Sequence, residues 1–249
     1  MPELNHILIP VALTFLLAGM VKGVTGMGLP TVSMGLLGLV MAPAQAAALL
    51  LVPSTITNIW QYAAGPNRLA IARRLAPMLL GIALATWSAT GMIAGGSAEE
   101  AVTGLGLALI VYALVGLTRY RLKVPPRSES WLGPLIGAAT GVVTGGTGVF
   151  VIPAVPYLQA IGLDAEDLVQ ALGLSFTVST LALAAGLASH GALHLEAGGA
   201  SLLCAVPALV GLAAGQWLRR RVNATTFRTL FFAGLLILGV DLALRSVLV

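Results

Sequence analysis

One lysine lies deep within apolar sequence, in a segment that is rich in glycine and threonine. Lys22 belongs to residues 19–30, which read GMVKGVTGMGLP and separate two apolar runs, each too short to cross a bilayer comfortably. A charged side chain near the bilayer centre is costly unless it faces a cavity or a counter-ion. No carboxylate of the first half lies at a comparable depth, because Glu99 and Glu100 fall at an expected loop. The segment therefore favours an anionic ligand beside Lys22. The alternative is a lysine that snorkels outward from a helix C-terminus.

A second glycine- and threonine-rich break occupies residues 137–153, which read GAATGVVTGGTGVFVIP. Glycine lets the backbone approach a ligand, and the amino end of a helix presents free N–H groups to an anion. We expect one half-helix to begin near 28–30, with Pro30 in its first turn. A second should begin near Gly148, capped by Thr147. Close helix packing through small residues is the alternative to a set of candidate substrate ligands in the two breaks. This set is Lys22, Thr25, Gly26, Met27, Gly28, Thr144, Gly145, Gly146, Thr147 and Gly148.

Two of the apolar pieces carry a polar face that can line the same site. Ser54 and Asn58 are four residues apart and Gln61 is three further along, so all three share one face of a helix. Ser175 and Ser179 repeat this spacing in the second half. Hydrogen bonding between helices explains the same pattern equally well. Ser54, Asn58, Ser175 and Ser179 complete the set of candidate substrate ligands.

The other ionisable residues indicate no catalytic or metal centre. His190 and His194 have a spacing that binds metal on a helix, but they flank Gly191 at a loop and lack a third ligand. The sequence shows no Ser-His-Asp set and no glycine-rich nucleotide loop, so we expect neither an enzyme nor a cofactor. Asp241 is the one candidate buried acid, which argues against a dedicated proton relay. Transport is then expected to follow the anion gradient and the membrane potential.

The composition places these residues in a polytopic membrane protein. Of the 249 residues, 58% are hydrophobic and only 9% are charged, against about 25% in soluble domains. The basic residues form no stripe with aromatic residues that would bind nucleic acid, and the single cysteine excludes an intramolecular disulfide. We expect an all-α fold whose apolar pieces are roughly 6–21, 29–42, 45–63, 75–94, 100–118, 132–144, 149–160, 165–188, 198–218 and 226–247.

The pieces fall into two halves that look like repeats. The residues Pro77, Gly81 and Trp87 recur, each with its own type, 130 positions later, and the two glycine-rich breaks recur at a spacing near 120. Pieces 29–42 and 149–160 make helices of roughly 20 Å, shorter than the hydrocarbon core of about 30 Å, and are predicted to be half-helices. The predicted organisation is a first transmembrane repeat at 1–118, a cytoplasmic linker at 119–130 and a second transmembrane repeat at 131–249.

Counting helices in each half predicts that the second repeat is inverted. A broken pair returns to its starting side, and three further transmembrane helices make an odd number of crossings. The loops at 64–74, 119–130 and 219–225, together with Arg228, then share one side and hold every Lys and Arg except Lys22 and Arg245. By the positive-inside rule that side is cytoplasmic. We therefore predict a multi-pass protein of the cell (inner) membrane with both termini outside.

The chain resembles the TauE/SafE sulfite-exporter family of anion permeases, also named the toluenesulfonate uptake permease family. The resemblance covers essentially the whole chain and is most specific at residues 19–30, at 141–148, and at PYLQ (156–159) followed by IGL (161–163). It implies transport of small sulfur-containing anions such as sulfite, thiosulfate, sulfoacetate or related organosulfonates. Many members have a longer glycine run in each repeat, whereas here the first repeat keeps only GMG at 26–28, with Lys22 nearby.

We therefore predict a membrane transporter, a permease or exporter, for small sulfur-containing anions. A passive anion channel is the first alternative, and a membrane-embedded enzyme is a less favoured one. The predicted partners are the anion and the lipid bilayer, with no nucleic acid. The sequence leaves open the exact anion, the direction of transport, the coupling ion and the oligomeric state, for which a homodimer is one option.

Overall fold

The computed structural model describes residues 2–118, 123–193 and 195–248, and every regular element in these ranges is a helix. The prediction of an all-α fold is therefore confirmed. The helices are α1 (Pro2–Thr25), α2 (Leu29–Leu37), α3 (Pro43–Ala64), α4 (Arg68–Gly95), α5 (Ala98–Leu117), α6 (Pro126–Thr147), α7 (Ala154–Ala160), α8 (Ala165–Ser189), α9 (Leu195–Arg219) and α10 (Ala224–Leu248).

Six helices in the described part of the chain are long and apolar enough to cross a membrane, namely α1, α4, α5, α8, α9 and α10. The protein is thus a polytopic membrane protein. α3 has 22 residues but carries a polar face, and it is not among the six. α2 and α7 have only nine and seven residues, which confirms that these two segments are too short to span a bilayer.

The helices before the two breaks are longer than the sequence predicted. α1 has 24 residues and α6 has 22, which corresponds to roughly 35 Å at about 1.5 Å per residue. The prediction that the run before the first break is too short to cross a bilayer is therefore wrong. Gly19 and Gly23 remain helical because their lack of a side chain lets the α9 backbone approach. A Cβ at Gly23 would collide with the Leu212 carbonyl oxygen.

Both breaks occur at glycines with a left-handed backbone. Gly26, Gly28 and Gly148 have φ of +79°, +101° and +71°, a region that other residues adopt only with strain. Gly28 is the N-cap of α2 and Pro30 lies in its first turn, as predicted. The prediction of a helix beginning near Gly148 is wrong, because this glycine ends α6 and α7 begins only at Ala154. A non-helical segment of several residues therefore separates α6 from α7.

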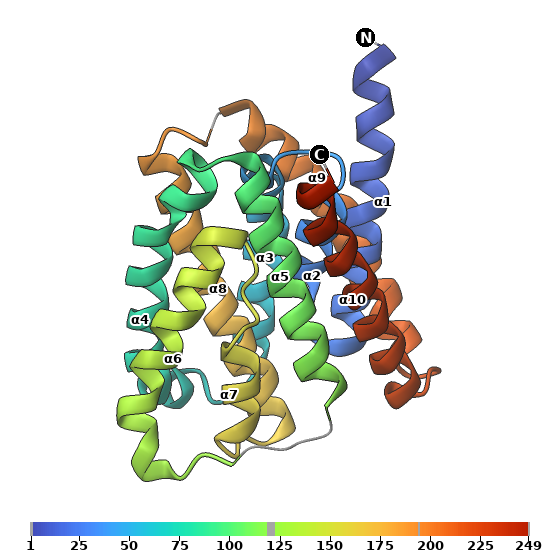
Figure 1. Cartoon of the computed structure of the whole chain (residues 1–249). Coiled ribbons are helices and arrows are strands. Elements are labelled where there is room, and N and C mark those ends of the chain that lie inside the picture. The colour runs from blue at the N-terminus through green and yellow to red at the C-terminus, as the bar shows by residue number, and fades with distance from the viewer. Residues whose placement is uncertain (1, 119–122, 194, 249) are drawn as a thin grey trace.

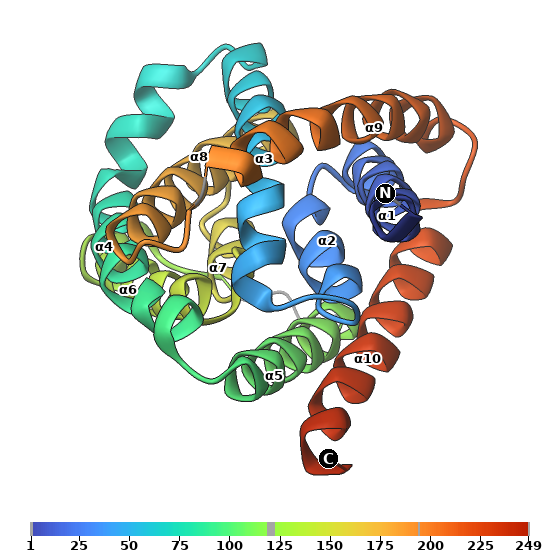
Figure 2. The same cartoon turned by 90° about the horizontal axis from the view of Figure 1, so that it is seen from above.

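The two short helices lie inside the bundle, with α3 between them when the molecule is seen from above (Figure 2). All of α2 except Leu36 is buried. Around them α1 packs against α9, α4 against α6, α5 against α10 and α3 against α8. In Figure 1 α1 descends and α2 turns back upward, whereas α6 ascends and α7 turns back downward. These opposite directions support the predicted inversion of the second half, which remains a prediction.

The packing of α1 on α9 is repeated by that of α6 on α4. A Cβ at Gly211 of α9 would collide with the Leu16 carbonyl oxygen of α1. In the same way, a Cβ at Gly81 of α4 would lie 2.6 Å from the Pro134 carbonyl oxygen of α6. Gly81 and Gly211 are 130 positions apart in the sequence, and the residues that they approach, Leu16 and Pro134, are 118 apart. Two close helix contacts thus recur with the same geometry, which supports the predicted duplication.

The breaks themselves recur at a different spacing. Gly26 and Gly148, which share the same left-handed backbone, are 122 positions apart. The packing contacts on α1 and α6 are only 118 apart. α6 therefore has about four extra residues, roughly one helical turn, between its contact with the neighbouring helix and its break. This extra turn accounts for the difference between the spacings of 118 and 122, whereas the spacing of 130 between Gly81 and Gly211 requires a further insertion between the second break and α9.

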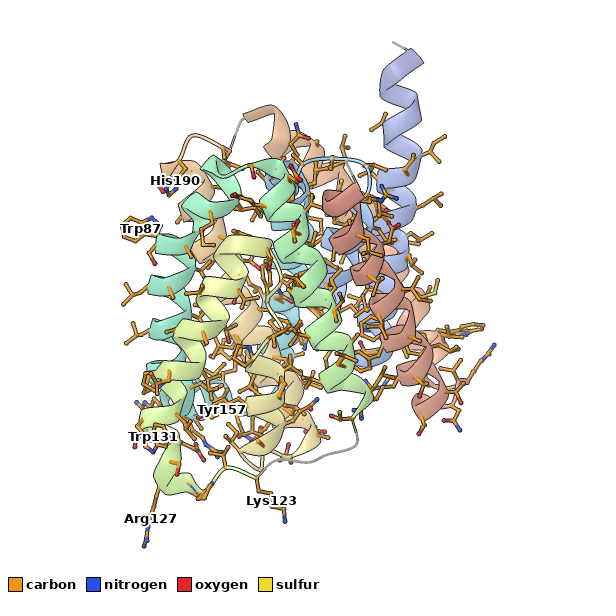
Figure 3. All side chains as sticks on the ribbon, viewed as in Figure 1. Trp87, Lys123, Arg127, Trp131, Tyr157 and His190 are labelled. Carbon is orange, nitrogen blue, oxygen red and sulfur yellow. The ribbon has the colours of Figure 1, made fainter. Side chains whose placement is uncertain are left out.

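The ends of the described chain and the basic loops lie at opposite ends of the bundle. In Figure 1 the start of α1 and the end of α10 are at the top, whereas α3, α5 and α9 end at the lower end. Figure 3 shows Lys123 and Arg127 at that lower end and His190 at the upper one. This arrangement agrees with the predicted topology, and which end faces the cytoplasm remains a prediction.

Candidate functional site

Lys22 lies in the last turn of α1 and points into the protein. Only 2% of its surface is exposed. Its ammonium donates to the Thr57 hydroxyl oxygen at 3.0 Å and to the side-chain oxygen of Asn58, both on α3. Thr57 and Asn58 are themselves buried. The lysine is therefore held inside the bundle and does not snorkel to the membrane surface.

α3 lacks one backbone donor just before the turn that meets this lysine. Pro53 has no N–H, so the Leu49 carbonyl four residues earlier lacks its helical donor. The Ser201 hydroxyl of α9 replaces that donor, because it donates to the Leu49 carbonyl oxygen at 2.8 Å. The same hydroxyl accepts from the Val52 amide at 3.0 Å. A side chain of α9 thus stabilises the turn of α3 that precedes the partners of the lysine.

No acidic side chain in the described structure balances the charge of Lys22. Among the described side chains the ion pairs are Arg74 with Glu129 and Arg245 with Asp241. Every other described lysine or arginine side chain is exposed, and none of the described Asp or Glu side chains is buried. The ammonium is held by neutral oxygen atoms alone. The interior around it therefore carries one positive charge without a protein counter-charge.

Buried polar atoms without a partner lie on α3 and α8. They include the Asn58 amide nitrogen and the hydroxyl of Ser54 on α3, and the hydroxyls of Ser175 and Ser179 on α8. All four side chains are fully enclosed. The two helices approach closely, since a Cβ at Gly173 of α8 would lie 3.0 Å from the Asn58 carbonyl oxygen. An unpaired buried donor costs about 1–3 kcal/mol, so these groups are suited to bind a ligand.

The threonines of the two breaks bond to the backbone of their own breaks. The Thr25 hydroxyl donates to the Val21 carbonyl at 2.9 Å and accepts from the Met27 amide at 3.2 Å. Thr147 makes the same two contacts with its own neighbours, at 2.6 Å and 3.2 Å, so it stabilises the end of α6 and does not cap a following helix. Thr144 donates to a backbone carbonyl one turn earlier, at 2.7 Å. These hydroxyls therefore have a local role in this conformation.

The glycines of the second break have different surroundings. A Cβ at Gly145 would lie 2.7 Å from the Thr86 carbonyl oxygen, whereas one at Gly146 would have ordinary room. A Cβ at Gly148 would lie 2.7 Å from the methyl group of Met34, which belongs to α2. The second break thus contacts the half-helix that begins at the first break. Direct contact between the two breaks remains a prediction.

Two side chains link the first break to other helices. The Gln61 amide of α3 donates to the Gly26 carbonyl at 3.0 Å and to the Val169 carbonyl of α8 at 2.8 Å. The Tyr112 hydroxyl of α5 contacts the Met27 sulfur at 3.2 Å. The first break is therefore fixed from both sides by long helices that pack around it.

The chain matches the family described as Sulfite exporter TauE/SafE over residues 11–242. The chain belongs to the TauE/SafE family. No curated protein and no solved structure matched in the corresponding comparisons. The resemblance to this family is thereby confirmed, and membership of TauE/SafE, a family of membrane transporters, agrees with the six apolar helices.

For this TauE/SafE member the structure adds side chains that the sequence did not single out. Thr57 accepts a hydrogen bond from the Lys22 ammonium, and Ser201 donates one to the α3 backbone one turn before Pro53. Three further buried hydroxyls, those of Thr31, Ser33 and Thr86, have no hydrogen-bond partner. A serine or threonine within an apolar helix usually satisfies itself on its own backbone, so the sequence alone does not reveal such contacts.

The remaining ionisable residues lie away from the lysine. The His190 ring is exposed and lies 2.9 Å from the Gly186 carbonyl oxygen, and His194 is outside the described residues. No group of described residues is suited to hold a metal ion. The interpretation of Asp241 as a buried acid is wrong, because its side chain is 48% exposed and pairs with Arg245 at 2.9 Å.

Proposed function

We propose that this TauE/SafE protein transports small sulfur-containing anions, such as sulfite, thiosulfate or organosulfonates, and binds them at Lys22 between α1, α3 and α8. One observation carries the proposal. The interior holds a buried ammonium whose described partners are neutral oxygens, and no described acid lies close enough to pair with it. A bound anion supplies the missing negative charge.

The described contacts leave hydrogen-bond donors free for such an anion. An ammonium has three N–H groups, and two of those on Lys22 are used by Thr57 and Asn58. The Asn58 amide nitrogen is unpaired, so its N–H groups are available beside the third ammonium hydrogen. The unpaired serine hydroxyls of α3 and α8 add further donors. A sulfur oxyanion has several acceptor oxygens and matches this combination of one charge and several neutral donors.

The remaining candidate ligands are the glycines, threonines and Met27 of the two breaks. In this proposal they serve the conformational change of the transporter. Paired interrupted helices in the two halves of a transporter mark the place where a site can open to alternate sides. Gly26, Gly28 and Gly148 supply the flexible points, and the contact of Gly148 with Met34 of α2 supports a link between the two breaks. With Asp241 at the surface, the described transmembrane helices contain no buried carboxylate relay. We therefore propose that the anion gradient and the membrane potential drive transport, which favours export from a negative-inside cell.

The location in the cell is part of the same proposal. The basic loops at the lower end of the bundle face the cytoplasm, and both termini face outward across the cell membrane. The exposed indole rings of Trp60, Trp87, Trp131 and Trp217, each between 52% and 69% exposed, suit contact with the two membrane interfaces.

Counterflow of labelled anion in proteoliposomes tests the proposal. Purified protein should exchange radiolabelled sulfite or thiosulfate against an excess of the same unlabelled anion, with saturation. Lys22→Ala should abolish this exchange, whereas Lys123→Ala, which removes the only other lysine from an exposed site, should retain it. Flux that does not saturate and shows no counterflow would indicate a channel. Normal exchange by Lys22→Ala would contradict the proposed site.

A further inference from the structure

Building on the proposed function, we infer that the site selects singly charged anions over doubly charged anions of the same shape. The inference concerns the charge of the ligand, which the family membership leaves open. It rests on the charge balance inside the protein and on the neutral character of the unpaired groups near Lys22.

The interior supplies one positive charge. Lys22 is the only buried Lys or Arg among the described side chains. In the second half, the position that corresponds to Lys22 is a threonine by either spacing. The spacing of the packing contacts gives Thr140, and the spacing of the breaks gives Thr144. Both threonines are fully buried and their hydroxyls bond to their own helix. The duplicated architecture therefore places a charge in one half only.

The partners of this charge and the unpaired buried groups on α3 and α8 are neutral. Asn58 and Ser54 on α3 and Ser175 and Ser179 on α8 offer unpaired dipolar groups but no second cation. With a singly charged anion the lysine and its ligand form a neutral pair. A doubly charged anion would leave one net negative charge in a water-poor interior, and burial of an unbalanced ion is strongly unfavourable.

Methanesulfonate and sulfate are a matched pair of test ligands. Both are tetrahedral at sulfur, and one methyl group in the first replaces one charged oxygen in the second. Each keeps its charge throughout the neutral pH range, so a comparison of the two does not depend on ligand protonation. We expect methanesulfonate to bind at least about tenfold more tightly than sulfate. The free energy needed to bury one unbalanced charge exceeds the free energy that corresponds to a tenfold change in affinity.

The experiment measures inhibition of counterflow by the two anions, with the whole protein in proteoliposomes. The carried anion is labelled sulfite below neutral pH, where singly charged hydrogensulfite predominates. Thiosulfate, which carries two charges, is by this inference a less favoured substrate than hydrogensulfite or an organosulfonate. Competition is preferred over thermal stabilisation because sulfate stabilises folded proteins in general. Inhibition by methanesulfonate at a concentration at least about tenfold lower than sulfate supports the inference. Equal inhibition, stronger inhibition by sulfate, or no inhibition by methanesulfonate overturns it while transport itself stands. Absence of saturable exchange of any sulfur anion contradicts the proposed function instead.

Discussion

The substitution Asn58→Asp changes the charge of the site while it keeps its shape. The Asn58 side-chain oxygen already accepts from the Lys22 ammonium, and a carboxylate can accept in the same place. The site would change from one net positive charge to none. The unpaired amide nitrogen, which is a donor for the anion in our account, would become a negatively charged oxygen.

The expected effect on binding is large. An anion bound to the same ammonium would place an oxygen within about 4 Å of the new carboxylate, where two like charges repel by about 4 kcal/mol at an effective dielectric constant of about 20. This energy corresponds to roughly a thousandfold weaker anion binding. The fold should be retained or strengthened, because a buried lysine gains a charged partner with good geometry.

The assay combines counterflow in proteoliposomes with thermal unfolding of the purified protein. Asn58→Asp should lose saturable exchange of sulfite or thiosulfate and unfold at the same temperature as the wild type or above it. Asn223→Asp is the matched control, because Asn223 is exposed and its side-chain oxygen accepts from the Thr225 amide, as a carboxylate can also do. Retention of high-affinity exchange by folded Asn58→Asp protein would refute the charge argument.

Three further predictions concern the elements that position the site. Gly148→Ala should lower stability by about 1–2 kcal/mol, because its φ is +71° and a Cβ would lie 2.7 Å from Met34, whereas Gly146→Ala should be tolerated. Equal unfolding temperatures for the two variants would contradict this account of the break. Ser201→Ala should lower stability by about 1–3 kcal/mol, since the Leu49 carbonyl loses the donor that replaces the missing N–H of Pro53, and Ser201→Thr should restore part of the loss in the same unfolding assay. A cysteine at Arg220, introduced with Cys204→Ala, should resist impermeant thiol reagents added outside intact cells, and ready labelling would overturn the proposed orientation.

The sequence revealed those parts of the fold that depend on local chemistry. Left-handed backbone positions need glycine, so Gly26 and Gly28 correctly marked the first break. The length of α1 was missed because Gly19 and Gly23 were assigned to the break, with close helix packing kept only as the alternative. They are tolerated in the helix because the α9 backbone packs where their side chains would be, and this contact between distant segments is not visible in a single sequence.

The candidate site was predictable in part for the same reason. A lysine far from any loop can be recognised in the sequence, and its neighbour Asn58 was found from the polar face of its helix. Ser201 lies about 150 residues from its partners on α3, and only the packing of α9 on α3 brings them together. Asp241 was misread because an apolar helix can carry an acid on its outer face when an arginine four residues later pairs with it.

The position of a bound anion tests the central claim most directly. Crystals of the protein grown with 2-bromoethanesulfonate, a singly charged sulfonate, would reveal the ligand through the anomalous scattering of bromine. The account predicts an anomalous peak inside the bundle within a few ångströms of the Lys22 ammonium, with the sulfonate oxygens facing Asn58. A peak found only at the exposed arginines of the loops, with the Lys22 site occupied by protein atoms alone at saturating ligand, would contradict it.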